Sequence, residues 1–188
     1  MEIYQLQASY QAQQDRILLR MNTQSNEEFR LWLTRRMVKS FFPHLVQISA
    51  QQASNPAQLI SHDSADNTAL ATFKKQESLA KADFQTPYSA EMLSLPIGSE
   101  PLLATKMHVT QLEKQLLRLG FEEESPGDNK PRAFEVTLGP SILHSLLHLL
   151  EVVLKNADWG FVAAQAPAPP ETGLLDDFAA AKPPVYLN

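Results

Sequence analysis

The chain contains no cysteine and few of the residues that build catalytic loops. Among 188 residues, the absence of cysteine excludes disulfide bonds, thiolate zinc sites and a cysteine nucleophile. Only six glycines occur, and none of them opens a helix in a Gly-rich phosphate-binding pattern. A Gly-x-Ser-x-Gly nucleophile turn is also missing. We therefore expect a protein that is not an enzyme and that uses no cofactor.

Long apolar runs and an excess of positive charge are missing as well. No apolar run approaches the roughly 18–20 residues that a membrane helix needs, and the first residues have neither a basic start nor an apolar core. These features predict a soluble, cytoplasmic protein. The formal net charge of −5 argues against general binding of polyanions. The basic residues nevertheless outnumber the acidic ones within residues 1–52.

Two parts of the sequence resemble each other. Residues 29–42 align without gaps with residues 134–147, and their apolar positions coincide. The identical pairs are Phe29 with Phe134, Leu33 with Leu138, and Ser40 with Ser145. Upstream, residues 18–21 (Leu-Leu-Arg-Met) match residues 116–119 (Leu-Leu-Arg-Leu). This similarity predicts one structural unit that occurs twice.

Within each part, the apolar pattern changes from a period of two to a period near 3.6. Apolar residues alternate with other residues in four short runs, which is typical of half-buried strands: Ile17, Leu19 and Met21; Phe29, Leu31 and Leu33; Leu117, Leu119 and Phe121; Phe134, Val136 and Leu138. A helix follows each second run. Thr34 can cap the first helix, and Pro140 after Gly139 suits the start of the second. Pro43 predicts an interruption of the first helix near residues 42–44.

We therefore predict an α+β fold of two tandem βββα units with pseudo-twofold symmetry, in which each antiparallel sheet is backed by its own helix. We predict one domain at 1–160 and a disordered Ala/Pro-rich tail at 161–188. The domain consists of a first unit at 1–52, a partly ordered connector at 53–100 and a second unit at 101–160. The connector contains a predicted helix at 66–82.

One helix carries three side chains of the kinds that bind metal ions. His144, His148 and Glu151 follow an i, i+4, i+7 spacing, which brings them to one face of a helix. That face lies nearly opposite the apolar stripe of the same helix, so we interpret it as a solvated surface. The sequence therefore predicts no metal site.

Cationic and aromatic side chains gather on the second face of the first unit's sheet. The residues of this candidate binding surface, with the adjoining helix start, are Arg16, Arg20, Arg30, Trp32, Arg35 and Arg36. An aromatic ring among guanidinium groups suits single-stranded nucleic acid, because bases stack on the ring while cations contact phosphates. The same pattern also fits a protein interface, or a solvated face on which arginine pairs with Glu28.

Two consecutive units of antiparallel strands closed by a helix, with Arg20, Arg30 and Trp32 on a sheet face, resemble the PUR-alpha and Whirly group of single-strand-binding proteins. The resemblance covers residues 1–52 and 101–160. It implies binding of single-stranded DNA or RNA through the sheet faces, with Arg16, Arg20, Arg30 and Trp32 as contact residues. The chain also resembles uncharacterised bacterial proteins.

The tail contains one short acidic and apolar cluster: Leu174, Leu175, Asp176, Asp177 and Phe178. A groove on another protein could bind such a motif, although two aspartates also serve simply to keep a tail soluble. We expect a non-catalytic binding or adaptor module that acts through contacts with a protein partner or through homodimer formation, with Trp32 and this tail motif as anchors. The alternative function is single-stranded nucleic-acid binding, and no membrane association is expected.

Overall fold

The computed structural model of the chain describes most of the predicted domain. The described residues are 3–53, 72–73, 75–80, 82, 86–89, 93–124 and 131–160. The tail at 161–188, with its motif from Leu174 to Phe178, lies outside the described residues. Residues 72, 73 and 75–80 are helical and fall within the range predicted for the connector helix, the rest of which is not described.

The first part of the chain forms an antiparallel sheet followed by a helix. Its elements are β1 (Ile3–Gln11), β2 (Arg16–Thr23), β3 (Glu28–Thr34) and α1 (Arg35–Ala53). Leu19 lies opposite Ala8 on one side and opposite Leu31 on the other, so β2 is the middle strand of the three. Thr34 accepts a hydrogen bond from the amide of Met37 at 3.3 Å and thereby caps α1, as the sequence predicts.

The second part begins with a short strand that joins the first sheet. Its elements are β4 (Leu102–Leu103), β5 (Lys106–Gln111), the 3-10 turn η2 (Glu113–Gln115), β6 (Leu117–Glu123), β7 (Arg132–Leu138) and α3 (Pro140–Ala157). β4 pairs in parallel with β3, which gives a four-stranded sheet in the order β1-β2-β3-β4. The other sheet is antiparallel, in the order β5-β6-β7. The predicted α+β class is confirmed, with sheets of four and three strands.

One hydrophobic core lies between the two sheets and the two helices. The inner positions of the four predicted strand runs are all buried: Ile17, Leu19, Met21, Phe29, Leu31, Leu33, Leu117, Leu119, Phe121, Phe134, Val136 and Leu138. The ring of Phe29 from the first sheet stacks on that of Phe134 from the second, with 4.8 Å between centroids. The rings of Phe121 and Phe134 are 5.4 Å apart. These aromatic contacts join the two sheets.

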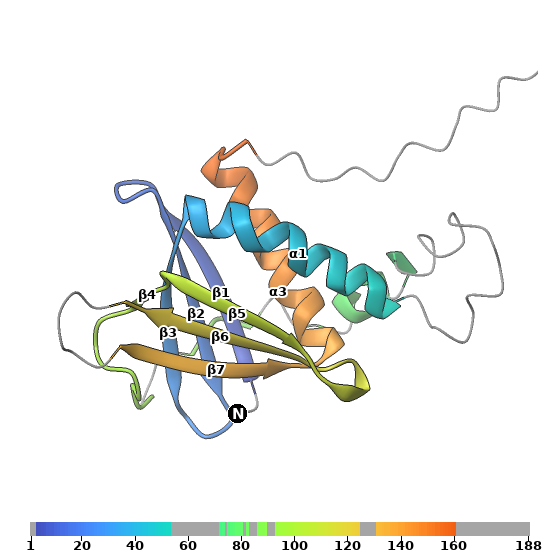
Figure 1. The fold of residues 1–188 in the computed structure, drawn as a ribbon, viewed down its shortest axis with the longest axis horizontal. Coiled ribbons are helices and arrows are strands. Elements are labelled where there is room, and N and C mark those ends of the chain that lie inside the picture. Colours follow the sequence, from blue (N-terminus) through green and yellow to red (C-terminus); the bar gives the residue numbers. More distant parts are fainter. Residues whose placement is uncertain are drawn as a thin grey trace, which may run out of the picture.

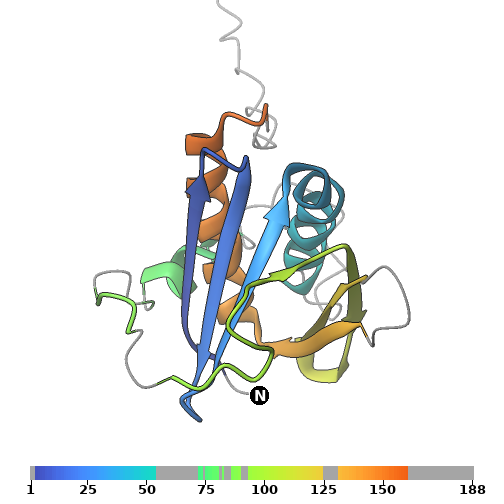
Figure 2. The same ribbon diagram turned by 90° about the vertical axis from the view of Figure 1, so that its left-hand side faces the viewer.

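The two long helices pack against each other, and each approaches the sheet of the other part of the chain (Figure 1). α3 makes its main sheet contact with β1, whereas its contact with β7 is small. Turned by 90°, the molecule shows α3 behind β1, and α1 beside β3 with the three-stranded sheet below it (Figure 2). The expectation that each sheet is backed by its own helix is therefore wrong for α3. Its apolar stripe is wide enough to pack against both α1 and β1.

The predicted interruption of α1 at Pro43 is also not observed, because the helix runs from Arg35 to Ala53 with Pro43 inside it. Pro43 is exposed, so its ring lies on the solvent side of the helix. None of the helices among the described residues combines the length and apolar character needed to cross a membrane.

The end of α3 is fastened to the hairpin between β1 and β2. Trp159 is only 1% exposed, and its indole N–H donates to Asp15 Oδ1 at 2.5 Å. The Tyr10 hydroxyl donates to the same oxygen at 2.9 Å, and its ring meets that of Trp159 edge to face. Both hydrogen bonds lower the pKa of Asp15, and the bond from Trp159 has the larger effect. We refer to Tyr10, Asp15 and Trp159 as the indole clasp.

Candidate functional site

Several side chains of the predicted binding surface lie on one face of the first sheet, but other residues of the same chain already contact them. Arg20 lies directly opposite Arg30, and Trp32 lies opposite Leu18 on the same side of the sheet. Glu28, which is 4% exposed, lies beside both arginines. Its carboxylate is 2.7 Å from Arg20 and 3.8 Å from Arg30. Arginine thus pairs with Glu28, as one of the alternatives predicts, but Glu28 is buried and does not lie on a solvated face.

The connector covers part of the same face. The Tyr88 hydroxyl donates to Glu28 Oε1 at 3.0 Å, and the Arg20 guanidinium lies over the Tyr88 ring at 4.4 Å from its centroid. Burial, together with the negative charge of Glu28, raises the pKa of Tyr88, so its hydroxyl remains a donor. Arg30 also donates to the carbonyl oxygen of Ser99. We name Arg20, Glu28, Arg30 and Tyr88 the Glu28 cluster.

The other predicted residues of this surface lie apart from the cluster. Trp32 is half-buried in β3, between β2 and β4. Arg16 begins β2, at the far end of the strand from Glu28. Arg35 donates to the carbonyl oxygen of Trp159 at 3.4 Å, and Arg36 lines a groove between α1 and β5. The six predicted residues therefore do not form one continuous site.

The histidine-bearing face of α3 is covered rather than solvated. His144 is only 5% exposed, so the interpretation of this face as a solvated surface is wrong at that residue. The connector helix lies beside this face, because Lys75 reaches Glu151 at 2.8 Å. Burial, and to a lesser extent the charge of Lys75, lowers the pKa of His144. Within the described residues, no three His, Asp or Glu side chains are grouped so that they could hold a metal ion.

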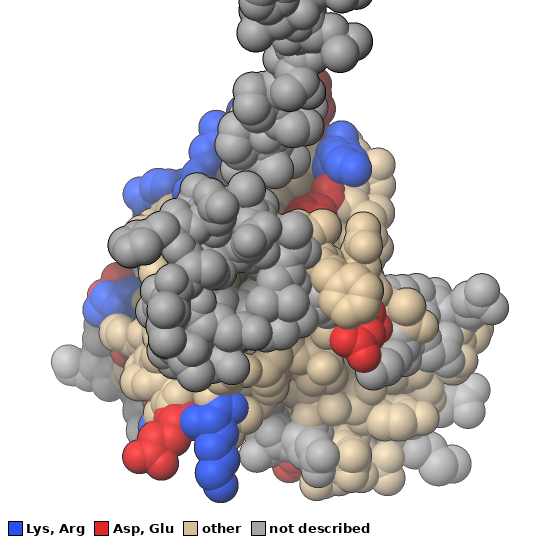
Figure 3. Space-filling view, turned by 90° about the vertical axis from the view of Figure 1, so that its right-hand side faces the viewer, with Lys and Arg blue, Asp and Glu red and all other residues tan. Residues whose placement is uncertain are grey.

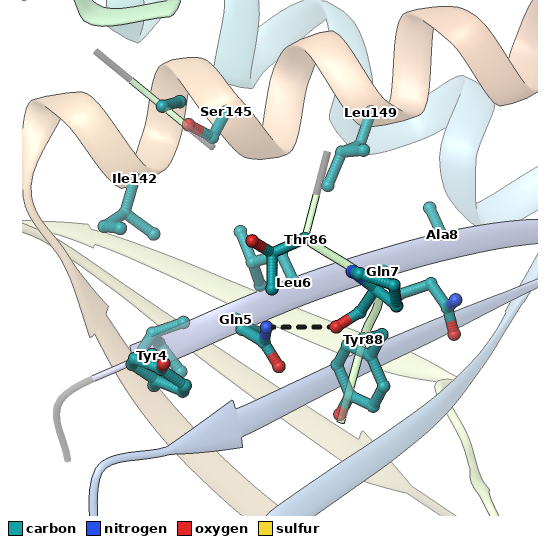
Figure 4. A pocket seen from close by; sticks show the side chains of 13 residues that line it. Tyr4, Gln5, Leu6, Gln7, Ala8, Thr86, Tyr88, Ile142, Ser145 and Leu149 are labelled. Carbon is teal, nitrogen blue, oxygen red and sulfur yellow. Dashed lines mark hydrogen bonds between the residues drawn. The ribbon is translucent and has the colours of Figure 1, made fainter. Parts of the chain in front are cut away.

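A first groove, of about 540 Å³, lies between β1 and α3. Six consecutive residues, 3–8, line it from β1. Because side chains on a strand alternate between faces, consecutive residues can line one groove only where the edge of the strand borders it. Ile142, Ser145 and Leu149 of α3 form the opposite wall (Figure 4).

Part of the connector forms a further wall of this first groove. Thr86 and Tyr88 extend over β1 (Figure 4), and the Gln5 side chain donates to the carbonyl oxygen of Pro87 at 3.4 Å. Gln5 also accepts from the amide of Ser89 at 3.0 Å. Asn22, 2% exposed, donates to Gln5 at 3.1 Å and to the Ser89 carbonyl oxygen at 3.3 Å. The exposed side of β1 therefore holds a segment of the same chain through polar side chains.

A second groove, of about 880 Å³, lies between β5 and α1. On one side it is lined by residues 103–109 and Gln111, and on the other by Thr34 at the end of β3 and by six residues of α1: Arg36, Met37, Ser40, Phe41, His44 and Ile48. The consecutive run again shows that the edge of a strand, here β5, borders the groove. Among the described strands, only β6 pairs with β5, so the edge of β5 that faces the groove has no described partner strand.

β5 is much more exposed than its partner β6. Met107 and Val109 lie opposite the buried residues Phe121 and Leu119, which places them on the core-facing side of the sheet. Val109 is nevertheless 37% exposed, and Met107 is half-buried. The described part of the chain therefore leaves apolar side chains of the second sheet incompletely covered in this groove.

Comparison with protein-family models, with curated proteins and with solved structures gave no match. The geometry of the two grooves is therefore the observation on which a functional argument can be built. The sequence gives little indication of either groove, since each combines segments far apart in the chain. In residues 106–111 the apolar alternation is limited to Met107 and Val109, so the sequence marks the strand that borders the second groove only weakly.

Proposed function

We propose that this protein is a non-catalytic protein-binding module that binds an extended segment of a partner along the edge of β5, in the second groove. In this mode a peptide adds a strand to a sheet, main-chain hydrogen bonds provide affinity, and pockets for alternate side chains provide selectivity. The observation that carries the proposal is the exposed strand edge beside incompletely covered apolar residues, Met107 and Val109, with α1 as the opposite wall.

Strand edges of this kind are usually protected in natural proteins, because unpaired backbone groups attract other strands. β5 has six residues and no proline, and the described residues place neither a strand nor a helix directly on its outer edge. Alternate residues of an antiparallel edge strand direct their N–H and C=O groups outward. An added peptide strand would satisfy these groups and cover Val109.

We also propose that the two parts of the chain arose from one βββα unit and are related by a pseudo-twofold axis. In support, the aligned residues Phe29 and Phe134 stack on each other, as counterparts near a twofold axis do. Both parts have three antiparallel strands followed by a helix. One difference remains: Met21 lies opposite Phe29, whereas its counterpart Leu119 lies opposite Val136. The second hairpin is thus shifted by two residues, which keeps the same side chains inward.

The pseudo-symmetry relates the two grooves as well. In the alignment of Phe29 with Phe134, the wall residues Met37, Ser40 and His44 of the second groove fall on the wall residues of the first groove: Ile142, Ser145 and Leu149. β1 and β5 take equivalent places as edge strands. In the first groove, residues 86–88 of the chain itself lie over β1 and form part of the lining. By this relation, the second groove is suited to a segment from another molecule.

A peptide selection would test the proposed function. Peptides are selected from a displayed random library on the intact protein, and their affinities are then measured for two variants by fluorescence anisotropy. Val109→Glu places a charge in the second groove, while Tyr4→Glu is the matched control on β1, where Tyr4 is 64% exposed. We expect Val109→Glu to reduce affinity at least about tenfold, a loss of about 1.4 kcal/mol, and Tyr4→Glu to leave it unchanged. Equal affinities for both variants would refute the β5 site.

Single-stranded nucleic-acid binding through the first sheet is the alternative proposal. Arg20, Arg30 and Trp32 share one face, which supports it, but Glu28 and Tyr88 already engage the guanidinium groups. Figure 3 shows the side of the molecule turned away from this sheet, where blue Lys and Arg side chains stand in separate groups, several of them beside red acidic side chains. An oligonucleotide titration at two salt concentrations tests this alternative, because phosphate contacts weaken steeply as salt rises. Loss of binding in Arg20→Ala or Trp32→Ala would support it, and no binding at low salt would remove it.

A further inference from the structure

We infer that the partner segment bound in the second groove is acidic, with carboxylates alternating with apolar side chains along an extended strand. This inference rests on the proposed strand addition at β5 and specifies its ligand. Three features support it: the charges that line the second groove, the position of those charges on α1, and the uncharged lining of the first groove.

The second groove is lined by cationic and titratable basic groups. Arg36 and His44 are exposed on the α1 wall, and Lys106 and His108 are exposed on β5. None of its described lining residues is Asp or Glu. In a chain with a net charge of −5, this is a local reversal of sign. An anionic ligand would be attracted to this groove more than to the rest of the protein.

The basic side chains of β5 already have carboxylates beside them, at the end of the neighbouring strand β6. Lys106 pairs with Glu124, and His108 Nε2 lies 3.6 Å from Glu122. Among the described residues, no carboxylate pairs with Arg36. The α1 wall is thus the main source of positive charge available to a ligand, with Arg36 as its central residue.

The placement of this charge on α1 is unfavourable for the helix by itself. α1 contains no Asp or Glu in 19 residues, and Arg35 and Arg36 occupy its first turn. The aligned peptide dipoles make the N-terminal end of a helix positive, so cations in the first turn are disfavoured there. A carboxylate-bearing strand in the groove would lie beside this end of α1 and offset the repulsion.

The first groove provides the contrast. Its described lining residues include no charged side chain, and its helix wall presents Ile142, Ser145 and Leu149. Leu149 takes the position of His44 in the alignment. The two grooves therefore share a strand edge and a helix wall but differ in electrostatic character, so the charge of the second groove does not follow from the fold.

Two synthetic peptides would test the inference on the intact protein: one of alternating Asp and Val, and a matched peptide with Asn in place of every Asp. We expect the Asp peptide to bind about tenfold more tightly at low salt, with the difference shrinking as salt rises. Arg36→Glu should remove this preference. Lys155→Glu makes the same charge change at an exposed position outside the groove and should preserve it.

The outcomes separate the inference from the proposed function. Equal affinities of the two peptides, both lost in Val109→Glu, would overturn the acidic preference and leave strand addition at β5 standing. Binding of neither peptide would overturn both. If the protein dimerises as its concentration rises and loses peptide affinity in the same concentration range, the groove binds a second copy of the chain, which would overturn an acidic partner.

A competition experiment tests the chain's own tail. Competition by a peptide of residues 171–180, but not by its Asp176→Asn, Asp177→Asn form, would support the acidic preference and identify the tail as one such segment.

Discussion

The two grooves share one construction but differ in the segments that line them and in their charge. In the first groove, Gln5 and Asn22 hold residues 87–89 of the connector beside β1. In the second groove, only α1 with Thr34 and the segment from Leu103 to Gln111 contribute described lining residues. The comparison teaches that two grooves built from a strand edge and a helix can differ in the side chains of their walls, and our proposal assigns the difference in ligand to those side chains.

The largest expected effect tests whether the two halves contribute equally to the core on which both grooves are built. Phe29→Ala and Phe134→Ala each remove one ring of the stacked pair, and we expect each to lower the free energy of unfolding by about 3–5 kcal/mol. The double variant should lose less than the sum, because the rings contact each other. Urea denaturation measures all three values. A loss below about 1 kcal/mol for either single variant would contradict the shared core.

The next effect tests the attachment of the connector near the first groove. Glu28→Gln removes the charge that binds Arg20 and Tyr88, and we expect a loss of about 2 kcal/mol because the buried guanidinium contacts are left unbalanced. Glu135→Gln is the matched control, since its ion pair with Arg118 is exposed and 3.9 Å long; it should cost less than about 0.5 kcal/mol. Hydrogen exchange should speed up at the Tyr88 and Ser89 amides in Glu28→Gln only. Unchanged exchange there would argue against the Glu28 cluster as the anchor.

A smaller effect compares the inner sides of the two edge strands. Leu6 packs against the core from β1, whereas Val109 is partly exposed on β5. We expect Leu6→Thr to cost about 1–2 kcal/mol and Val109→Thr less than about 0.5 kcal/mol, because little apolar area is buried at Val109. Thermal or urea denaturation measures both. A cost at Val109 equal to that at Leu6 would mean that β5 is already covered in the isolated protein.

The smallest effect appears only on acidification and concerns the helix that forms the wall of the first groove. The pKa of His144 is lowered in the folded state, so the unfolded chain binds more protons as the pH falls below about 6.5. The stability contributed by neutral His144 is complete above that pH and is lost as the pH falls toward the folded-state pKa. His144→Gln should flatten this dependence, and Lys75→Gln should flatten it in part. The free energy of unfolding, measured between about pH 5 and 7.5, provides the check, and an identical slope in His144→Gln would exclude this cause.

The sequence predicts the strands whose two faces differ in environment. Leu19 and Leu31 alternate with half-buried residues because one face of their sheet packs on the core, and burial of one face produces a period of two. In β5 this signal is limited to Met107 and Val109, and most residues of the strand are exposed. β4 has only two residues, too few to produce any pattern.

The arrangement of the helices and of the site is much less predictable. The apolar stripe of α3 shows that the helix is covered, but not whether β1 or β7 covers it. His144 has the spacing of a solvated face and is buried by a connector helix whose position no local pattern reveals. Arg36 and Lys106 line one groove from segments far apart in the sequence, so their joint charge becomes visible only in the folded chain.

The indole clasp has a consequence for how the chain acquires its structure during synthesis. Trp159 reaches Asp15 across 144 positions, and α3 covers β1 over similar separations. Contacts between such distant residues slow folding, because the loop between them must close before they form. While the ribosome is still adding the later residues, β1 lacks its covering helix and presents its apolar side to the nascent chain's surroundings. The emerging polypeptide therefore passes through an aggregation-prone interval that ends only when the last turn of α3 docks.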